Sequence, residues 1–280
     1  MGRILIFGAG WLGHKFQEYL GAEVSAADIT DGRQVAGALE RVKPGTVINA
    51  AGKTGKPNID WCETHRQETV ASNVTGPLVL LKECLPRNIR LVHLSSGCIF
   101  NGPAPRPEGF SEEDEPRPAS FYAWTKARAE EVLREFPVLI LRLRMPIDGI
   151  PNPRNLITKL AGYPEIVDVE NSLTAVEDLL FAAKRLIAED AVGIFNVVNP
   201  GAVRHPEIMD RYRAMVDPGH AYRVISTEEL YRKGMVKTGR SNCILDTRKL
   251  ARAGVVLRPV SERIEECLKI YKTYWSDKSD

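Results

Sequence analysis

Short apolar runs alternate with amphipathic stretches through the first half of the chain. Their lengths and spacing predict strands at residues 3–7, 23–27, 46–50, 90–94 and 138–142. They predict helices at residues 11–20, 35–42, 68–84 and 121–135. Strands that alternate with helices build βαβ units, so we expect an α/β fold with a doubly wound parallel sheet.

The regular alternation ends near residue 145. Prolines follow at positions 146, 151, 153 and 164, and from Pro200 onward the chain has few long apolar runs. Between these parts, residues 176–187 and 194–198 predict one more helix and strand that return to the sheet. We therefore expect a sheet domain of residues 1–145 plus about 174–200, and a smaller C-terminal lobe of residues 146–173 and 201–280.

One long loop, residues 101–120, joins a predicted strand to a predicted helix. It contains five prolines and an acidic run at residues 112–115. Long loops at such places are usually functional or mobile. We expect the acidic run to be a solvated surface.

A glycine-rich turn connects the first predicted strand to the first predicted helix. The segment Gly8-Ala-Gly10-Trp11-Leu12-Gly13 has the G-x-G-x-x-G pattern of a dinucleotide site. Gly8 permits the tight turn, Gly10 lets a pyrophosphate approach the backbone, and Gly13 permits close packing of helix on strand. The phosphates would lie at a helix N-terminus, so we expect a Rossmann domain that binds NAD(P) through this segment.

Asp28 follows the second predicted strand, about 20 residues beyond the first glycine of the turn. A carboxylate there accepts hydrogen bonds from the adenosine ribose and repels a 2′-phosphate, which favours NADH. Asp28 can also be an ordinary turn residue beside Thr30 and Asp31, and Arg33 offers a cation for a 2′-phosphate. The sequence leaves the choice of coenzyme open.

Tyr122 and Lys126 are four residues apart, which places a phenol and an ammonium on one face of a helix. A neighbouring lysine favours the phenolate and equips Tyr122 to return a proton to an alkoxide. A second pair at this spacing, Tyr274 and Lys278, lies in the terminal segment and is attributed to chance. The first pair follows a strand that ends near Ser96, whose hydroxyl is expected to hold a substrate oxygen.

The composition narrows the possible functions. Hydrophobic residues are 44% and charged residues 26% of the 280, which excludes a disordered or collagen-like chain. The 38 basic and 36 acidic residues are spread along the chain and leave a net charge of only +2, so a nucleic-acid partner is not expected. No apolar run reaches the roughly 18 residues of a membrane span. The five cysteines show no metal-ligand spacing, so we expect a cytoplasmic protein without a metal.

Taken in order, the glycine turn, Asn49-Ala-Ala-Gly52, Ser96 and the Tyr122/Lys126 pair resemble the extended short-chain dehydrogenase/reductase family. The chain is most similar to its plant and viral nucleotide-rhamnose synthase/epimerase-reductases, and it also resembles the dTDP-4-dehydrorhamnose reductases. The matching segments are residues 49–63, 97–100, 120–126, 143–146 and 152–159. The resemblance implies that further cofactor contacts come from Asn49, Ala50, Ala51, Gly52, Tyr122 and Lys126.

The resemblance implies a 3,5-epimerase/4-reductase that converts an NDP-4-keto-6-deoxyglucose, with UDP or dTDP as nucleotide, to NDP-L-rhamnose. The hydrogens on C3 and C5 lie α to the C4 carbonyl, so an oxyanion site of Ser96 and Tyr122 serves both epimerisation and reduction. The resemblance places the epimerisation cysteine on Cys98 and its partner on Lys159. A thiolate at Cys98 needs a cationic neighbour, and Lys159 and Lys126 are candidates. By itself, a free cysteine is more often a small buried hydrophobe.

Three further residues are candidates for contact with the sugar nucleotide: Arg144, Asn155 and Arg240. Guanidinium groups suit a diphosphate, although Arg240 can equally belong to a surface turn. The family's structural or proton-relay asparagine falls on Asn73. Asp60 and Glu63 either cap a helix or line the site. The family's usual dimer faces fall on residues 68–84 and 121–135, which implies a homodimer.

Two other functions fit the same motifs. One is a reductase that only reduces a ketone epimerised elsewhere, with Cys98 structural. The other is a non-catalytic NAD(P)-binding regulatory subunit, because a fold does not fix a function. The presence of Ser96, Tyr122 and Lys126 favours an enzyme. The plant relatives read NADPH through a basic residue where this chain has Asp28, so NADPH and NADH both remain candidates.

Overall fold

The predicted strands assemble into one six-stranded parallel sheet in the computed structural model, which describes residues 2–276. The strands are β1 (Ile4–Phe7), β2 (Glu23–Ser25), β3 (Thr46–Asn49), β4 (Arg90–Ser96), β5 (Leu139–Leu143) and β10 (Gly193–Asn196). Their order is β2-β1-β3-β4-β5-β10, so the direction of winding reverses between β1 and β3. The prediction of a doubly wound Rossmann-like fold is confirmed. Lys278 of the terminal Tyr/Lys pair lies outside the described residues.

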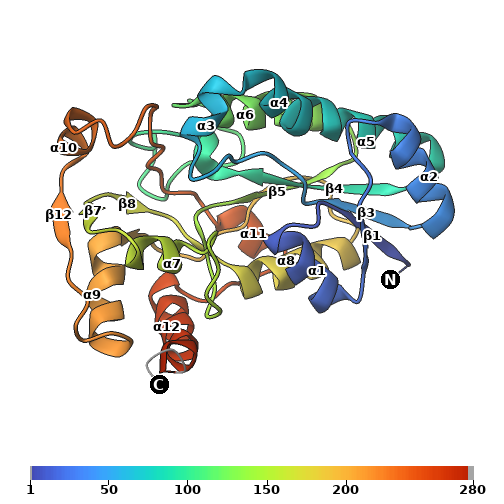
Figure 1. The fold of residues 1–280 in the computed structure, drawn as a ribbon. Coiled ribbons are helices and arrows are strands. Elements are labelled where there is room, and N and C mark those ends of the chain that lie inside the picture. The colour runs from blue at the N-terminus through green and yellow to red at the C-terminus, as the bar shows by residue number, and fades with distance from the viewer. Residues whose placement is uncertain (1, 277–280) are drawn as a thin grey trace.

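Helices cover both faces of the sheet, because successive strand residues point to opposite sides. Ile4 and Ile6 of β1 lie on the face covered by α1 (Trp11–Leu20), α8 (Val176–Ala188) and α11 (Arg248–Arg252). Leu5 and Phe7 lie on the face covered by α2 (Gly32–Val42), α5 (Gly76–Cys84) and α6 (Phe121–Leu133). Figure 1 shows these two helical layers below and above the sheet. Burial on both faces explains why the strands are apolar runs without polar alternation.

The helix predicted at residues 68–84 is a rod of three segments. They are α4 (Arg66–Val70), the π-turn η1 (Ala71–Thr75) and α5. Asn73 lies in the π-turn, where its Oδ1 accepts from the N–H of Lys53 at 2.7 Å and its Nδ2 donates to the Lys53 carbonyl at 2.9 Å. It also donates to Thr125 Oγ1 at 3.1 Å. Asn73 therefore fixes the loop after β3 against α6.

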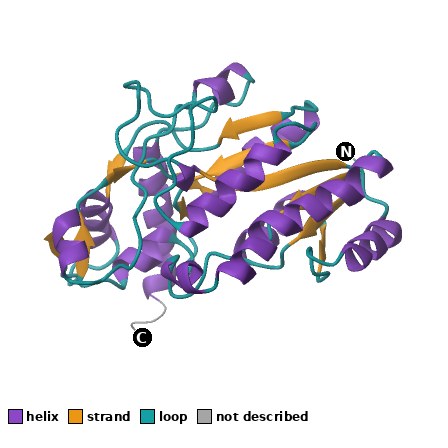
Figure 2. Ribbon diagram, turned by 90° about the horizontal axis from the view of Figure 1, so that it is seen from above, coloured by secondary structure: helices purple, strands orange, loops and turns teal. Residues whose placement is uncertain are grey.

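A third hydrophobic cluster lies apart from the two on the faces of the sheet. Its helices form a group at one end of the molecule (Figure 2). It joins α7 (Leu156–Ala161), α9 (His205–Met215) and α12 (Val260–Ser276). Three short strand pairs brace it: β6 (Pro146–Ile147) with β9 (Thr174–Ala175), β7 (Glu165–Val167) with β12 (Arg223–Ile225), and β8 (Glu170–Asn171) with β11 (Val203–Arg204). Strands of two or three residues carry too little pattern to be predicted. The remaining helices are α3 (Asp60–Thr64) and α10 (Thr227–Arg232).

The loop of residues 101–120 is attached to the sheet domain. Phe110 stacks on Phe100 with 4.5 Å between ring centroids. Glu112 is buried, and its carboxylate accepts from the N–H of Asn196 at 2.8 Å. The prediction of a solvated acidic run is therefore wrong at Glu112, which satisfies a buried donor of β10, although Glu113 is exposed.

Candidate active site

The residues singled out in the sequence gather at the carboxyl ends of three neighbouring strands. Gly8 follows β1, Asn49 ends β3 and Ser96 ends β4. The strand order reverses between β1 and β3, and open α/β sheets bind their ligands at such a point. The site therefore lies where the fold itself leaves a crevice.

The three glycines of the turn are required for different reasons. A Cβ on Gly8 would lie 2.4 Å from the backbone nitrogen of Ala51, and a Cβ on Gly13 would lie 1.9 Å from the Gly8 carbonyl oxygen. A Cβ on Gly10 would meet nothing within 4 Å. Gly8 and Gly13 thus permit close packing within the protein, whereas Gly10 borders open space.

The first turn of α1 is free to bind an anion. Gly10 is its N-cap and makes no side-chain hydrogen bond, so the N–H groups of the first turn have no side-chain acceptor at the cap. Trp11 and Leu12 are half-buried and pack against the sheet. On the far side of the crevice Asn49 Oδ1 accepts from the N–H of Ala51 at 3.1 Å, which shapes the turn before Gly52. These features fit the pyrophosphate of a dinucleotide.

A pair of alanine variants separates the two roles of the glycines. Gly13→Ala is expected to destabilise the fold by about 1–3 kcal/mol, because backbone must move to admit the methyl group. Gly10→Ala is expected to leave the thermal midpoint unchanged and to weaken dinucleotide binding, because its methyl group enters the crevice. Thermal unfolding and coenzyme fluorescence titration measure both. Equal destabilisation of the two variants would contradict this account.

Asp28 is exposed three residues beyond the end of β2. Its Oδ1 accepts from both the N–H and the hydroxyl of Thr30, at 2.9 and 2.8 Å. Arg33 is exposed at the start of α2. The turn interpretation of Asp28 thus has direct support, and the second carboxylate oxygen remains for a ribose.

The start of α6 is fixed from two sides, which positions Tyr122 in its first turn. Ser120 Oγ accepts from the N–H of Ala123 at 3.2 Å, and Glu63 Oε1 accepts from the N–H of Phe121 at 2.8 Å. Glu63 is therefore a helix cap. Burial raises the pKa of Tyr122, and the neighbouring thiols of Cys98 and Cys62 raise it further, whereas the Ser96 hydroxyl lowers it. The resting form is a neutral phenol that can donate its proton.

Lys126 lies one turn later and is buried. Its Nζ donates to the Leu94 carbonyl at 2.7 Å and lies 3.2 Å from Nε2 of His93. Burial lowers the pKa of Lys126 to about 8, against the opposing charge of Glu130. Lys126 is not among the groups that act most strongly on Tyr122 in the resting site, and its Nζ is directed to β4, so its effect on the phenolate stays a prediction.

Cys98 lies in the short 3-10 turn η3 (Gly97–Ile99) that follows Ser96. The strand ends at Ser96, whose Oγ accepts from the N–H of Cys98 at 3.2 Å, so the two side chains are related by a turn and not by strand alternation. Burial raises the pKa of Cys98 to about 11, and the cations that oppose this most strongly are Arg144 and Lys126. Lys159 is not among the groups that act most strongly on the thiol.

Lys159 is half-buried on α7. Its side chain makes no hydrogen bond or ion pair within residues 2–276, and burial followed by the charge of Arg154 lowers its pKa. Arg154 itself donates to Thr54 Oγ1, across from the loop after β3. Its charge also acts on Tyr122, so it lies within reach of both groups. The sequence analysis did not single out Arg154, although it lies inside the matching segment 152–159.

The three candidates for the diphosphate are all occupied by protein contacts, and two of them, Asn155 and Arg144, are buried. Asn155 is completely buried, caps α7 through the N–H of Ile157 at 3.1 Å, and donates to the Asp148 carbonyl at 2.7 Å. Arg144 is buried and donates to Asn171 Oδ1 at 2.6 Å and to the carbonyl of Ser241. Their contact with a diphosphate stays a prediction, and these bonds describe structural roles.

Arg240 forms a two-pronged ion pair with Asp60. The two guanidinium nitrogens lie 2.8 and 2.9 Å from the two carboxylate oxygens, across 180 residues of sequence. The pair lowers the pKa of Asp60 against the opposing effect of burial. Arg240 thereby joins the C-terminal part of the chain to α3, and diphosphate binding by Arg240 also stays a prediction.

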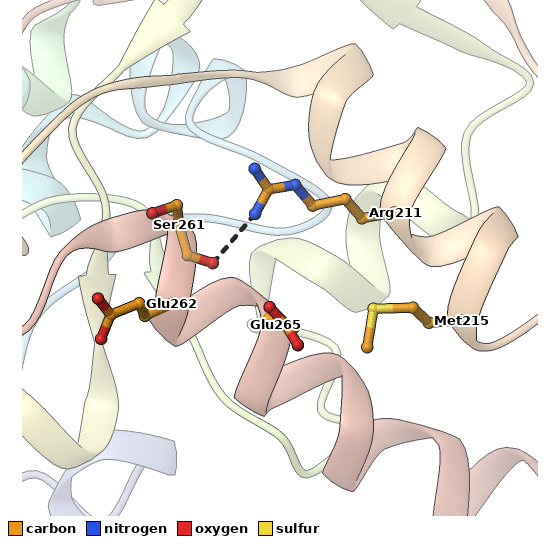
Figure 3. A pocket seen from close by; sticks show the side chains of 5 residues that line it. All are labelled: Arg211, Met215, Ser261, Glu262 and Glu265. Carbon is orange, nitrogen blue, oxygen red and sulfur yellow. Dashed lines mark hydrogen bonds between the residues drawn. The ribbon is translucent and has the colours of Figure 1, made fainter.

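A pocket apart from this site lies between α9 and α12 (Figure 3). Arg211 spans it and donates to the Ser261 carbonyl at 3.0 Å, and Glu262 and Glu265 line its other side. None of these residues belongs to the site at the strand ends. Among the described residues there is no group of three potential metal ligands, and no helix is long and apolar enough to cross a membrane.

Comparison with known proteins places the chain in a family. Residues 3–149 match the model of the RmlD substrate binding domain. An Arabidopsis thaliana protein named as a bifunctional dTDP-4-dehydrorhamnose 3,5-epimerase/reductase is 39% identical over 259 residues, 88% of this chain and 85% of its own length. The crystal structure of the L780 UDP-rhamnose synthase from Acanthamoeba polyphaga mimivirus superposes with a TM-score of 0.89 and 31% identity, covering 96% of this chain and 99% of that one.

A more distant structure shares the fold. It is a dTDP-4-dehydrorhamnose reductase from Bacillus anthracis, solved in complex with NADP, with a TM-score of 0.79, 23% identity, and coverage of 98% of this chain and 99% of that one. Identity and coverage with the Arabidopsis and mimivirus proteins are far above what a shared fold alone requires. The chain belongs to the RmlD substrate-binding-domain family of short-chain dehydrogenase/reductases, together with the plant and viral rhamnose synthases.

Proposed function

We propose that this chain is a bifunctional 3,5-epimerase/4-reductase that converts an NDP-4-keto-6-deoxy-D-glucose to NDP-L-rhamnose. The observation that carries the proposal is the meeting of Ser96, Cys98, Tyr122 and Lys126 beside the glycine turn. The Arabidopsis and mimivirus relatives described above are named for this pair of activities and for UDP-rhamnose synthesis. We propose that the lobe around α7, α9 and α12 binds the sugar nucleotide.

The epimerase step needs an acid and a base on either side of the sugar ring. Removal of the hydrogen on C3 or C5 leaves an enolate whose charge rests on the C4 oxygen, and the hydroxyls of Ser96 and Tyr122 stabilise that charge. Burial raises the pKa of the Cys98 thiol to about 11, which keeps the thiol protonated, and lowers the pKa of the Lys159 amine, which favours its neutral form. Lys159 therefore acts as the base and Cys98 as the acid.

The reductase step uses the same oxygen. A bound nicotinamide coenzyme supplies the hydride that reduces C4. Tyr122 gives its proton to the C4 oxygen as the alkoxide forms, and the ammonium of Lys126 stabilises the resulting phenolate. Ser96 keeps its hydrogen bond to the oxygen through both steps, so the sugar does not need to move between sites.

We propose NADPH as the coenzyme and a homodimer as the active form. Relatives of this fold have been solved with NADP or NADPH. The carboxylate of Asp28 argues for some tolerance of NADH, because it remains available to ribose hydroxyls. The dimer proposal rests on the family resemblance of α5 and α6 and on Trp124, which is 40% exposed on α6.

Incubation of the 4-keto sugar in deuterated water tests the function. The UDP and dTDP sugars are each supplied with NADPH and with NADH, and the product is examined by NMR. We expect NDP-rhamnose with deuterium at both C3 and C5. A reduced product without deuterium at these carbons would identify a reductase that only reduces. Absence of turnover with all four combinations would support a non-catalytic dinucleotide-binding protein.

A further inference from the structure

His93 is a completely buried histidine at the centre of the site that the proposed reaction does not use. It lies on β4, opposite Asn49 of β3 in the parallel register. Its Nδ1 lies 3.1 Å from Asn49 Nδ2, and its Nε2 lies 3.2 Å from Nζ of Lys126. The ring therefore connects the end of β3 to the lysine on α6.

The orientation of Asn49 determines which ring nitrogen carries the proton. Asn49 Oδ1 receives the N–H of Ala51, which can only donate, so the amide must direct its NH₂ group at His93. Nδ1 of His93 is then an acceptor and has no proton. Burial and the charge of Lys126 lower the pKa of His93 far below its usual range, so the ring is neutral and its single proton is on Nε2.

This tautomer places an N–H opposite Nζ of Lys126. An ammonium at Nζ would set two donors against each other at 3.2 Å, whereas a neutral amine can accept through its lone pair. The neutral amine still donates one hydrogen to the Leu94 carbonyl and has a second for the active site. We propose that His93 is a positioning residue for Lys126, held by Asn49 so that its Nε2–H faces Nζ, and that it sets the charge on this lysine. This inference rests on the proposed role of Lys126 in the reductase step.

The titratable groups Glu130 and Cys98 act against this effect, because they raise the pKa of Lys126. The charged or titratable groups that act on Nζ are Glu130 on its own helix, Cys98 in η3 and His93 on β4. The Glu130 carboxylate already forms an ion pair with Arg142 at 2.7 Å and accepts a hydrogen bond from the Ser95 hydroxyl. These contacts weaken its stabilisation of the Lys126 ammonium. Burial lowers the pKa of Lys126 to about 8. In the proposed tautomer the N–H of His93, 3.2 Å from Nζ, also favours the neutral amine.

We expect the rate of hydride transfer to fall above about pH 8, the pKa of Lys126. The ammonium is present below the pKa of Lys126 and is lost as the pH rises through it, so stabilisation of the phenolate is lost on the alkaline side. Removing the Nε2–H should raise that pKa and move the alkaline limb to higher pH. A purely structural role of His93 would lower the rate without moving the limb.

The tautomer is measured directly in the unmodified protein. Long-range ¹H–¹⁵N correlation spectra of ¹⁵N-histidine-labelled protein distinguish the two tautomers and the ionised ring. We expect His93 to be neutral with its proton on Nε2 from pH 6 to 9. His93→Gln assigns its signals, and His220→Gln, in the C-terminal part of the chain, is the control that leaves them in place. A proton on Nδ1, or an ionised ring at pH 7, would overturn the proposal.

Three variants test the effect on Lys126 through the pH dependence of single-turnover hydride transfer. Asn49→Asp should accept from Nδ1–H, reverse the tautomer and shift the alkaline limb upward. His93→Phe should shift it upward by up to about one unit. His93→Gln retains an N–H donor and should restore a limb close to that of the unmodified enzyme. An unchanged limb in Asn49→Asp would sink the idea, even if His93→Phe fails to fold.

The two proposals fail separately. If no 4-keto sugar is turned over, the proposed function is wrong, and the histidine spectra of the unmodified protein and of Asn49→Asp still decide the tautomer. If turnover is normal and the proton is found on Nδ1, the proposed function stands and the role of His93 is wrong.

Discussion

Tyr122→Phe is expected to slow reduction of the 4-keto sugar by about 10²- to 10⁴-fold, because it removes the proton donor to the C4 oxygen. Burial raises the pKa of Tyr122, so its proton is in place throughout the neutral range and the phenol is the acid of the resting site. Single-turnover absorbance at 340 nm measures the loss. The affinity for the coenzyme, measured in the same variant, should change little.

Tyr274→Phe is the matched control for that loss. Tyr274 is 42% exposed near the end of α12 and belongs to the pair attributed to chance. The control should retain full activity. If Tyr122→Phe reduces the ketone within a few-fold of the unmodified rate, another group protonates C4 and the proposed role of Tyr122 is wrong.

Cys98→Ser is expected to slow epimerisation at C3 and C5 by at least about 10²-fold and to spare reduction of a ketone that is already epimerised. A serine hydroxyl has nearly the size of the thiol but is a much weaker acid, so it fits the buried turn without supplying the proton. NMR of the product gives its configuration at C3 and C5, and coenzyme oxidation gives the reduction. The alkaline pKa of Cys98, about 11, means that the thiol is protonated over the whole working range.

Cys243→Ser distinguishes this effect from general disturbance of the buried sulfur atoms. Cys243 is buried in the same region, with its Sγ 3.2 Å from the Gly97 carbonyl, and a serine there can still donate to that oxygen. It should epimerise the sugar as the unmodified enzyme does. Epimerisation that persists in Cys98→Ser places the acid elsewhere, and equal loss in both variants would indicate a structural effect.

The sequence was sufficient where the signal is local. The strands of the sheet are continuous apolar runs because both faces are buried, and the turn of Gly8 to Gly13 is required by backbone contacts within 3 Å of a would-be Cβ. The spacing of Tyr122 and Lys126 is a property of one helix. The matching segments 97–100 and 152–159 also led to Cys98 and Lys159, through family resemblance.

Contacts between segments that lie far apart in the sequence could not be predicted from local patterns. The two-pronged ion pair of Arg240 with Asp60 joins positions 180 residues apart, and the sequence near either residue does not predict the other as its partner. Arg154 reaches Thr54 in the same way. Glu112 lies in an acidic run that looks solvated, and only the position of β10 shows that its carboxylate satisfies a buried N–H.

By itself the sequence determined the parallel sheet and predicted the dinucleotide turn and the Tyr122/Lys126 pair, because each depends on residues within one strand, turn or helix. Only the tertiary structure decided the protonation of the reacting side chains. Burial raises the pKa of Tyr122 and Cys98, which favours their protonated forms, and lowers the pKa of Lys126 and Lys159, which weakens their hold on a proton. The physical reason is that the cost of a charge is set by the water that distant segments exclude and by the neighbours they bring, such as His93 and Asn49.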